Sequence, residues 1–186
     1  MSRTFRFSFE IALCALAACA PDNSTPDGDA GDDQFVAITQ DFAGYESWQS
    51  YDLGGDDGGA TDDAGCAHVA NVPRVAFINE IPPHGSTSFP VGTIIVKEIH
   101  TGATPADWAV FGMVKRGGDY GAGSGCPGWE WYGLTDDDDG GTRIQWSGSQ
   151  ASGTDPYANC GPCAGCHSAA QTNDCVLAPE MSLSQW

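Results

Sequence analysis

The stretch from Thr93 to His100, TIIVKEIH, is the clearest strand in the sequence. It is rich in β-branched residues, which favour extended backbone, and its alternation places Thr93, Ile95, Lys97 and Ile99 on one face. A lysine on an apolar face costs desolvation free energy unless its ammonium reaches solvent or serves a site. Lys97 is therefore either a lysine that extends to solvent or a functional residue.

Further strands are predicted on both sides of this stretch. They are separated by turns rich in Gly, Pro and Asp and by little helix, as in antiparallel sheets. Upstream, aromatic side chains spaced three residues apart predict a short helix over residues 42–53. The expected fold class is α+β, mainly an antiparallel β-sheet with a few short helices. The predicted strands are RVAFIN (74–79), DWAVFGMVK (107–115), GWEWYGL (128–134), in which Trp129, Trp131 and Gly133 share one side, and TRIQW (142–146).

Residues 1–19 have the pattern of a bacterial lipoprotein signal peptide. Arg3 and Arg6 precede a short apolar run, and small residues lead into Cys19. Cys19 would become the lipidated N-terminus, which places the chain on the periplasmic or outer side of a bacterial membrane. An ordinary cleaved signal peptide that contains Cys19 is the alternative.

Residues 20–34 are rich in Pro, Gly and Asp and poor in apolar residues, which predicts a disordered acidic linker. The folded domain is expected over residues 35–186, a length that suits one core. The 186-residue chain has a formal net charge of −18. Such a surface repels nucleic-acid phosphates and anionic lipid head groups. Nucleic acid is therefore excluded as a partner, and the only membrane contact expected is the N-terminal lipid.

The segment Cys163-Ala-Gly-Cys166-His167 is a C-x-x-C-H motif in a chain predicted to be exported. Two cysteine sulfurs at this spacing can form thioethers to the two vinyl groups at one edge of haem, and the adjacent histidine reaches the iron. Small residues between the cysteines suit the tight turn. The motif therefore predicts one covalent haem c, attached at Cys163 and Cys166, with His167 as the metal ligand.

Other cysteine chemistries fit this motif less well. A zinc site of Cys160, Cys163, Cys166 and His167 would need two adjacent residues as ligands of one tetrahedral ion. The C-G-P-C segment that starts at Cys160 lacks the βαβ context of thioredoxin-like proteins. A third alternative is a lipoprotein without cofactor, in which all six cysteines of the mature domain form disulfides.

The cysteines outside the haem motif form an even set after the signal peptide and Cys19 are set aside. If Cys163 and Cys166 hold haem, four cysteines remain, and they allow two disulfides in three connectivities. We expect the pairs Cys160–Cys175 and Cys66–Cys126, of which the first would bracket the haem peptide.

Several segments, taken in order, resemble the cytochrome P-460 and cytochrome c′-beta family of β-sheet c-type cytochromes. Together they cover the chain from about residue 42 to about residue 176. The most specific part is F-P-x-G-T-x-x-V-K-E followed by a late C-x-x-C-H. The resemblance implies an antiparallel sheet with helices around it, a homodimer, and one five-coordinate haem c whose open face binds small nitrogen oxides. The matching segments are YESW, RVAFIN, FPVGTIIVKEIH, FGMVK, GWEWY and CAGCH.

The resemblance also implies roles for individual residues. In the P-460 branch, which oxidises hydroxylamine, a lysine that matches Lys97 is cross-linked to the haem edge, and an arginine that matches Arg74 lies in the pocket. The pocket carboxylate of that branch has no counterpart around Phe111 and Gly112. Loss of a positioned general base costs roughly two to four orders of magnitude in rate. An aromatic Phe111 over the iron suits the c′-beta branch, which binds nitric oxide or carbon monoxide in an apolar pocket.

Three functions are therefore considered. The first is oxidation of hydroxylamine or a related species, with Lys97 and Arg74 as catalytic residues and an unidentified redox partner. The second is non-enzymatic binding of nitric oxide, with Lys97 not cross-linked. The third is simple electron transfer, which needs a sixth ligand to iron. The residues available for these additional roles are His68, His84 and His100 as ligands, all expected to be exposed, and Glu98 and Glu130 as replacement carboxylates, both expected to face outward.

Overall fold

The computed structural model describes residues 34–55, 72–136, 141–152 and 161–186. These residues belong to one unit of the chain, Asp32–Trp186. The predicted signal peptide with Cys19 and almost all of the predicted linker lie outside the described residues. In the described part of the chain, no helix has both the length and the apolar character needed to cross a membrane.

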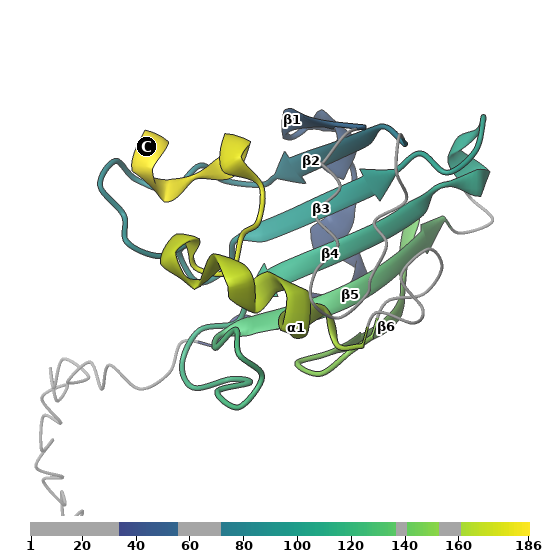
Figure 1. The fold of residues 1–186 in the computed structure, drawn as a ribbon. Coiled ribbons are helices and arrows are strands. Elements are labelled where there is room, and N and C mark those ends of the chain that lie inside the picture. Colours follow the sequence, from purple (N-terminus) through teal and green to yellow (C-terminus); the bar gives the residue numbers. More distant parts are fainter. Residues whose placement is uncertain (1–33, 56–71, 137–140, 153–160) are drawn as a thin grey trace, which may run out of the picture. The chain divides into compact units, whose positions relative to one another are not determined.

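Six strands form one sheet in which each strand pairs with its neighbours in the sequence (Figure 1). Every pair is antiparallel. This arrangement confirms the expected mainly antiparallel β-sheet, and the predicted strands are found with shifts of a few residues at their ends. The strands are β1 (Gln49–Gly54), β2 (Arg74–Ile78), β3 (Ile94–Ile99), β4 (Ala109–Lys115), β5 (Trp129–Asp136) and β6 (Thr142–Gly148).

The helices of the described residues are short. One is an α-helix, α1 (Cys163–His167). The helix predicted over residues 42–53 is wrong: Gly44 has a positive φ of 68°, which separates two 3₁₀ turns, and the following residues form β1. The alternation of that strand places Tyr51 and Leu53 against the core, which aromatic spacing alone did not reveal. The 3₁₀ turns are η1 (Thr39–Phe42), η2 (Tyr45–Ser47), η3 (Pro105–Asp107), η4 (Ser168–Asn173), η5 (Pro179–Met181) and η6 (Leu183–Gln185).

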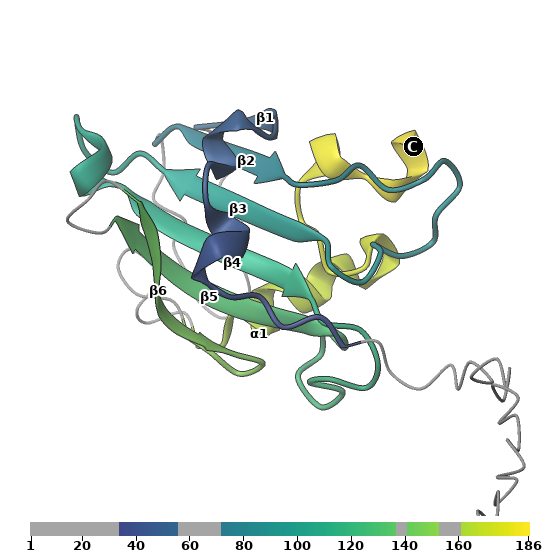
Figure 2. The same cartoon turned by 180° about the vertical axis from the view of Figure 1, so that it is seen from behind.

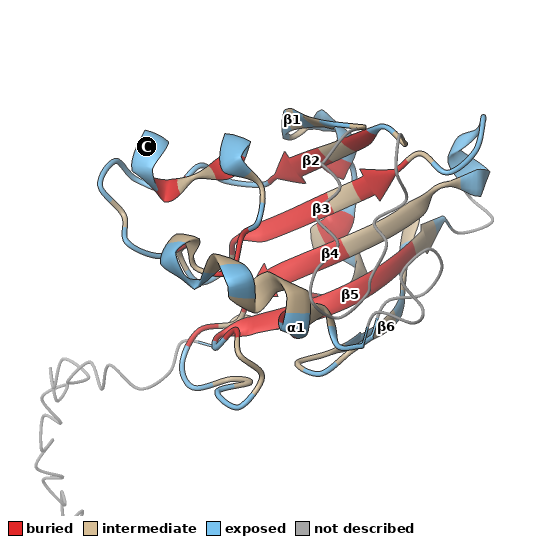
Figure 3. Ribbon diagram, in the orientation of Figure 1, coloured by how far each residue is buried: buried red, intermediate tan, exposed pale blue. Residues whose placement is uncertain are grey.

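The C-terminal segment covers one side of the sheet, which we call the front face (Figure 1). Ile95, Met113, Trp129 and Trp131 point to this side, where they form the larger of two buried clusters. Residues of α1 and of the segment that follows it complete the cluster, so the C-x-x-C-H motif packs directly on the sheet. Figure 3 shows the central strands buried beneath this segment. The C-terminal members of the cluster are Ala164, Cys175, Val176, Met181 and Leu183.

The N-terminal segment crosses the opposite side, the back face (Figure 2). Phe42 and Tyr45 pack there against Phe77, Val96 and Tyr132 in a second buried cluster. Because both faces of β2 to β5 are covered, these strands carry apolar residues on both sides rather than a strict polar alternation. The two faces therefore have separate sets of side chains, and the front face is the one that meets the C-x-x-C-H helix.

Candidate functional site

Helix α1 presents the C-x-x-C-H motif to the front face. It begins after Pro162, whose φ is −63°, and the backbone N–H of Cys163 donates to the carbonyl of Ala151 at 2.9 Å. Ala164 is fully buried in the front-face cluster, where a larger side chain would not fit without displacing its neighbours. Cys163, Cys166 and His167 are each half-buried, so the motif lies at the boundary between the core and solvent.

His167 is fixed by a hydrogen bond and a ring contact. Its Nδ1 lies 2.8 Å from the carbonyl oxygen of Cys175, and its ring centroid lies 4.5 Å from that of Trp131. A carbonyl can only accept, so Nδ1 carries the hydrogen and, in the neutral ring, Nε2 carries the lone pair. This is the tautomer that a histidine needs in order to bind a metal through Nε2.

A row of residues crosses four strands of the front face next to Trp131. The register pairs Lys97 with Phe111, Phe111 with Gly133, and Gly133 with Trp146. Lys97 and Phe111 are only half-buried although β3 and β4 are central strands. The structure thus brings two predicted site residues, Lys97 and Phe111, directly opposite each other.

Arg74 lies on the same face at the start of β2. It pairs with Ile99, two residues beyond Lys97 on β3, and shares its face with Ala76 and Ile78. The residue is 4% exposed, so Arg74 is not a surface arginine. Arg74 and Lys97 are consequently diagonal neighbours across the β2–β3 pair, as the predicted site requires.

Gly133 and Trp146 were not predicted as site residues. A Cβ at Gly133 would lie 2.7 Å from Cζ2 of Trp146 and closer still to Cε2 and Nε1, so the indole lies against the backbone of β5. The ring of Trp146 is also 6.2 Å from that of Phe111. A glycine inside a strand commonly marks such a close approach, and this was the signal available in the sequence.

Two buried indole N–H groups of the front face have no acceptor among the described residues. Nε1 of Trp131 and Nε1 of Trp146 find no hydrogen-bond partner in the part of the chain that the structure describes. A buried donor without an acceptor costs free energy, and native proteins rarely leave one. These donors fit a site that holds a group with acceptor atoms, and the carboxylates of haem are acceptors of this kind.

Lys97 acts electrostatically on the C-x-x-C-H segment. Burial raises the pKa of the Cys163 thiol, and the positive charge of Lys97 opposes part of that rise. The opposing effect requires the ammonium group to be near Cys163, although the two residues are far apart in the sequence. Lys97 is therefore close to the C-x-x-C-H helix as well as to Phe111.

The two replacement carboxylates lie on the back face. Glu98 is 5% exposed and accepts from the hydroxyl of Tyr45 at 2.8 Å, and Nε2 of His100 lies 2.9 Å from it. Glu130 is 6% exposed and accepts from Tyr132 and Arg116. The expectation that both residues face outward is wrong, because both are buried and hydrogen-bonded on the back face.

Two of the three histidines considered as sixth ligands lie in the described residues. His100 is held on the back face by Glu98 and stacks on Trp108 at 3.6 Å between ring centroids. His84 is exposed in the loop after β2. His68 lies outside the described residues.

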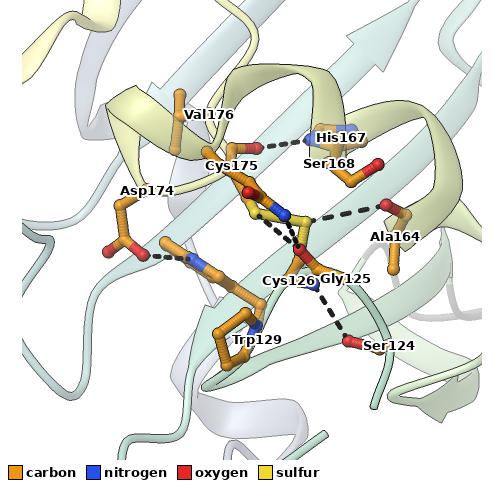
Figure 4. Close-up of a disulfide and its surroundings, with 12 residues drawn as sticks. Ser124, Gly125, Cys126, Trp129, Ala164, His167, Ser168, Asp174, Cys175 and Val176 are labelled. Carbon is orange, nitrogen blue, oxygen red and sulfur yellow. Dashed lines mark hydrogen bonds between the residues drawn. A yellow bond between two sulfur atoms is a disulfide. The ribbon is translucent and has the colours of Figure 1, made fainter. Parts of the chain in front are cut away.

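The disulfide pairing expected from the sequence is wrong. Cys126 and Cys175 form a disulfide, with 5.9 Å between their Cα atoms (Figure 4). The reason is a reversal of the chain after η4, where Asp174 and Cys175 have φ values of 48° and 67°. This reversal directs Cys175 to the loop before β5. Cys66 and Cys160 lie outside the described residues.

The alternatives to haem gain no support from the described residues. No group of three His, Cys, Asp or Glu side chains there is arranged to hold a metal ion, while Cys160, a member of the zinc alternative, is outside them. The sheet is antiparallel throughout, so the βαβ context of a thioredoxin-like motif is absent from this part of the chain. Neither Cys163 nor Cys166 belongs to the Cys126–Cys175 disulfide.

No family model, no curated protein and no solved structure matches this chain. The case for a function therefore depends on the side chains of the front face. Those side chains combine a C-x-x-C-H helix, a histidine of defined tautomer, a lysine, a buried arginine and two unsatisfied donors.

Proposed function

We propose that this chain is a mono-haem c-type cytochrome of the cytochrome P-460 and c′-beta kind, which acts on small nitrogen oxides. The observation that carries the proposal is the convergence of Lys97, Arg74 and Phe111 with the C-x-x-C-H helix on one face of the sheet. The sequence separates these residues widely, and only the antiparallel register brings them together. A merely structural C-x-x-C-H would not require them as neighbours.

Each part of the cofactor would have a partner in the chain. Cys163 and Cys166 would form the thioethers, and His167 would bind the iron through Nε2. The indole N–H groups of Trp131 and Trp146 would donate to acceptor atoms of the cofactor or its ligand. Haem supplies an iron that binds a small ligand and exchanges single electrons.

Lys97 and Arg74 support the enzymatic form of the proposal, the oxidation of hydroxylamine or a related species. The charge of Lys97 acts on the Cys163 thiol, so a haem attached at Cys163 would have its edge near this lysine, where the P-460 branch has its cross-link. Arg74 is buried beside it and provides a fixed positive charge for an electron-rich group. The electrons removed from the substrate would pass to an external one-electron acceptor.

A non-enzymatic nitric oxide binder is the second candidate. Phe111 and Trp146 give the row an aromatic, mainly apolar surface. Glu98 and Glu130, the two strand carboxylates considered as a general base, are held in hydrogen bonds on the back face. Proton transfer from hydroxylamine would need another base, whereas nitric oxide binding needs none.

The test is to express the chain with a haem-attachment system, then record its intact mass, its absorption spectrum and a peptide map. We expect the mass of one haem on a peptide that contains Cys163 and Cys166. Haem found on the Lys97 peptide, with a red-shifted Soret band on reduction, supports the hydroxylamine enzyme. An ordinary high-spin spectrum without that cross-link supports the nitric oxide binder.

Two histidine variants sharpen this test. His167→Ala should abolish native iron ligation, while His100→Ala, on the back face, should leave the spectrum unchanged. An unchanged spectrum in His167→Ala would contradict the ligand assignment. A wild-type chain without covalent haem, and with its cysteines in disulfides, would end the cytochrome proposal.

Export and lipidation remain part of the proposal. We expect Cys19 to carry lipid and to tether the domain on the periplasmic or outer side of a bacterial membrane, with the haem domain as a homodimer. Incorporation of labelled palmitate into the wild-type chain, but not into Cys19→Ser, is the expected result. Equal labelling of both chains would show that Cys19 is not the lipid site.

A further inference from the structure

We propose that the Cys126–Cys175 disulfide is a positioning device for the iron ligand: it holds the carbonyl of Cys175 against Nδ1 of His167. The inference goes beyond the proposed function and rests on it for the role of the histidine in the loaded protein. Cys175 is the positioning residue, because its carbonyl and not its sulfur meets the imidazole (Figure 4).

The backbone of Cys175 is in a conformation that needs external support. Its φ is 67°, and that of Asp174 is 48°, so two consecutive residues with side chains occupy the left-handed region. Each costs roughly 1 kcal/mol relative to right-handed backbone. This double reversal is what turns the carbonyl of Cys175 back toward α1. Asp174 pairs with Lys115 at 2.7 Å, and the N–H of Cys175 donates to the carbonyl of Ala170 at 2.9 Å. We expect the disulfide to add the contact that keeps the Cys175 carbonyl against His167.

The disulfide anchors this reversal to the same helix that carries the histidine. Sγ of Cys126 lies 3.6 Å from the carbonyl oxygen of Ala164, one turn before His167. Cys126 and Cys175 are fully or almost fully buried, at 0% and 2% exposure. The sulfur bridge therefore lies directly beneath α1 and fixes the distance between the helix and the acceptor.

The contact has a chemical consequence for the ligand. A hydrogen bond from Nδ1 selects the tautomer with its lone pair on Nε2, and it makes the imidazole a stronger electron donor. A stronger donor stabilises ferric iron relative to ferrous iron. Loss of the contact should therefore mix the tautomers in the apoprotein and raise the midpoint potential of the loaded protein.

Opening the bridge is a two-electron reduction. Dithiothreitol would supply two electrons and two protons, the Cys126–Cys175 bond would break to give two thiols, and the reagent would leave as its cyclic disulfide. The change is reversible on oxidation. The double variant Cys126→Ala, Cys175→Ala gives the same loss without a reductant.

The first arm of the experiment uses the full chain without haem. Nitrogen NMR of the His167 ring, recorded at a pH where imidazole is neutral, reports the tautomer directly. We expect a single Nδ1–H tautomer in the wild-type chain and a mixture in the double variant and after reduction. A double variant that keeps the single tautomer overturns the proposal, whether or not the chain binds haem.

The second arm uses the haem-loaded chain and measures the midpoint potential. We expect an upward shift in the double variant. Met181→Ala is the matched control, because Met181 is fully buried in the same C-terminal segment and its truncation weakens packing while the disulfide stays intact. An equal shift in Met181→Ala, or no shift in the double variant, overturns the proposal. If the wild-type chain takes up no haem, the role of His167 as an iron ligand is refuted. The tautomer result then still decides whether the disulfide holds the Cys175 carbonyl against His167.

Discussion

Replacing Gly133 with alanine adds one methyl group at the point where the indole of Trp146 lies against β5. The added Cβ would be 2.7 Å from Cζ2 of Trp146, and closer to two other ring atoms. Non-bonded carbon atoms settle at about 3.5–4.0 Å, so the indole has to move by about 1 Å or more. The backbone of β5 is central in the sheet and cannot yield as easily as a side chain on the edge strand β6.

The expected cost follows from this displacement. Overpacking of one methylene typically destabilises a protein by about 1–3 kcal/mol. Trp146 is only half-buried on an edge strand and can partly give way, so we expect the free energy of unfolding to fall by about 1–2 kcal/mol. The same movement takes the Trp146 ring away from Phe111 and so changes the front-face row of Lys97, Phe111, Gly133 and Trp146.

The assay combines chemical denaturation with the NMR signal of the Trp146 indole N–H and with ligand affinity of the haem-loaded chain. Gly112→Ala is the control, because its Cβ would meet Phe42 at 3.0 Å and Tyr132 at 3.3 Å on the back face. Both variants should lose stability, but only Gly133→Ala should shift the Trp146 signal and alter nitric oxide binding. If Gly133→Ala leaves the indole signal in place, or if Gly112→Ala changes ligand affinity equally, the assignment of Trp146 to the site is refuted.

The remaining predictions concern stability. Burial alone would raise the pKa of Glu130, but hydrogen bonds from Arg116 and Tyr132 outweigh it and hold the pKa below its ordinary 4.5. The carboxylate therefore stabilises the fold above pH 4.5 and loses that contribution as the pH falls through the lowered pKa. In urea titrations, Glu130→Gln should lower the free energy of unfolding by about 3 kcal/mol at pH 7 and by progressively less in acid. A loss that grows in acid would contradict this. Removing the Cys126–Cys175 bridge, which joins residues 49 apart, should lower the unfolding free energy by about 4 kcal/mol in guanidinium titrations; a loss under about 1 kcal/mol would contradict its role as an anchor. Asp174→Asn keeps a residue that tolerates positive φ but removes the charge opposite the almost buried Lys115. Thermal unfolding should show a stability loss of about 2–3 kcal/mol. An unchanged midpoint would mean that the ion pair contributes nothing to stability.

The strands and their faces could be predicted from the sequence because period-two alternation is a local property. The alternation in TIIVKEIH groups Lys97 with Ile95, and that in GWEWYGL groups Trp129 with Trp131. In the structure Ile95, Trp129 and Trp131 belong to the front-face cluster. What local patterns could not supply was the register, which sets Lys97 opposite Phe111 and Gly133 opposite Trp146.

The errors arose where tertiary contacts override local spacing. The aromatic spacing of residues 42–53 suggested a helix, but Tyr51 and Leu53 gain more by packing on the front-face core as part of a strand. The disulfide pairing was guessed from proximity in the sequence. Two consecutive positive φ values at Asp174 and Cys175 reverse the chain and bring Cys175 to Cys126, and no sequence signal predicts αL backbone at a cysteine.

Lys97 and Glu98 show how the sheet separates two kinds of chemistry. They are adjacent in the sequence, yet alternation sends Lys97 to the haem-motif side and Glu98 to a hydrogen bond with Tyr45 on the other side. A carboxylate that served as a general base for hydroxylamine would have to come from a strand position with the same parity as Lys97. Phe111 occupies the position directly opposite, so Phe111→Glu would place an acid beside the lysine. If the missing base is what separates the two candidate functions, this variant should gain hydroxylamine oxidation in the haem-loaded chain, whereas Val110→Glu, one residue away and on the back face, should not. Equal activity in both variants would show that the position of the carboxylate is not the deciding difference.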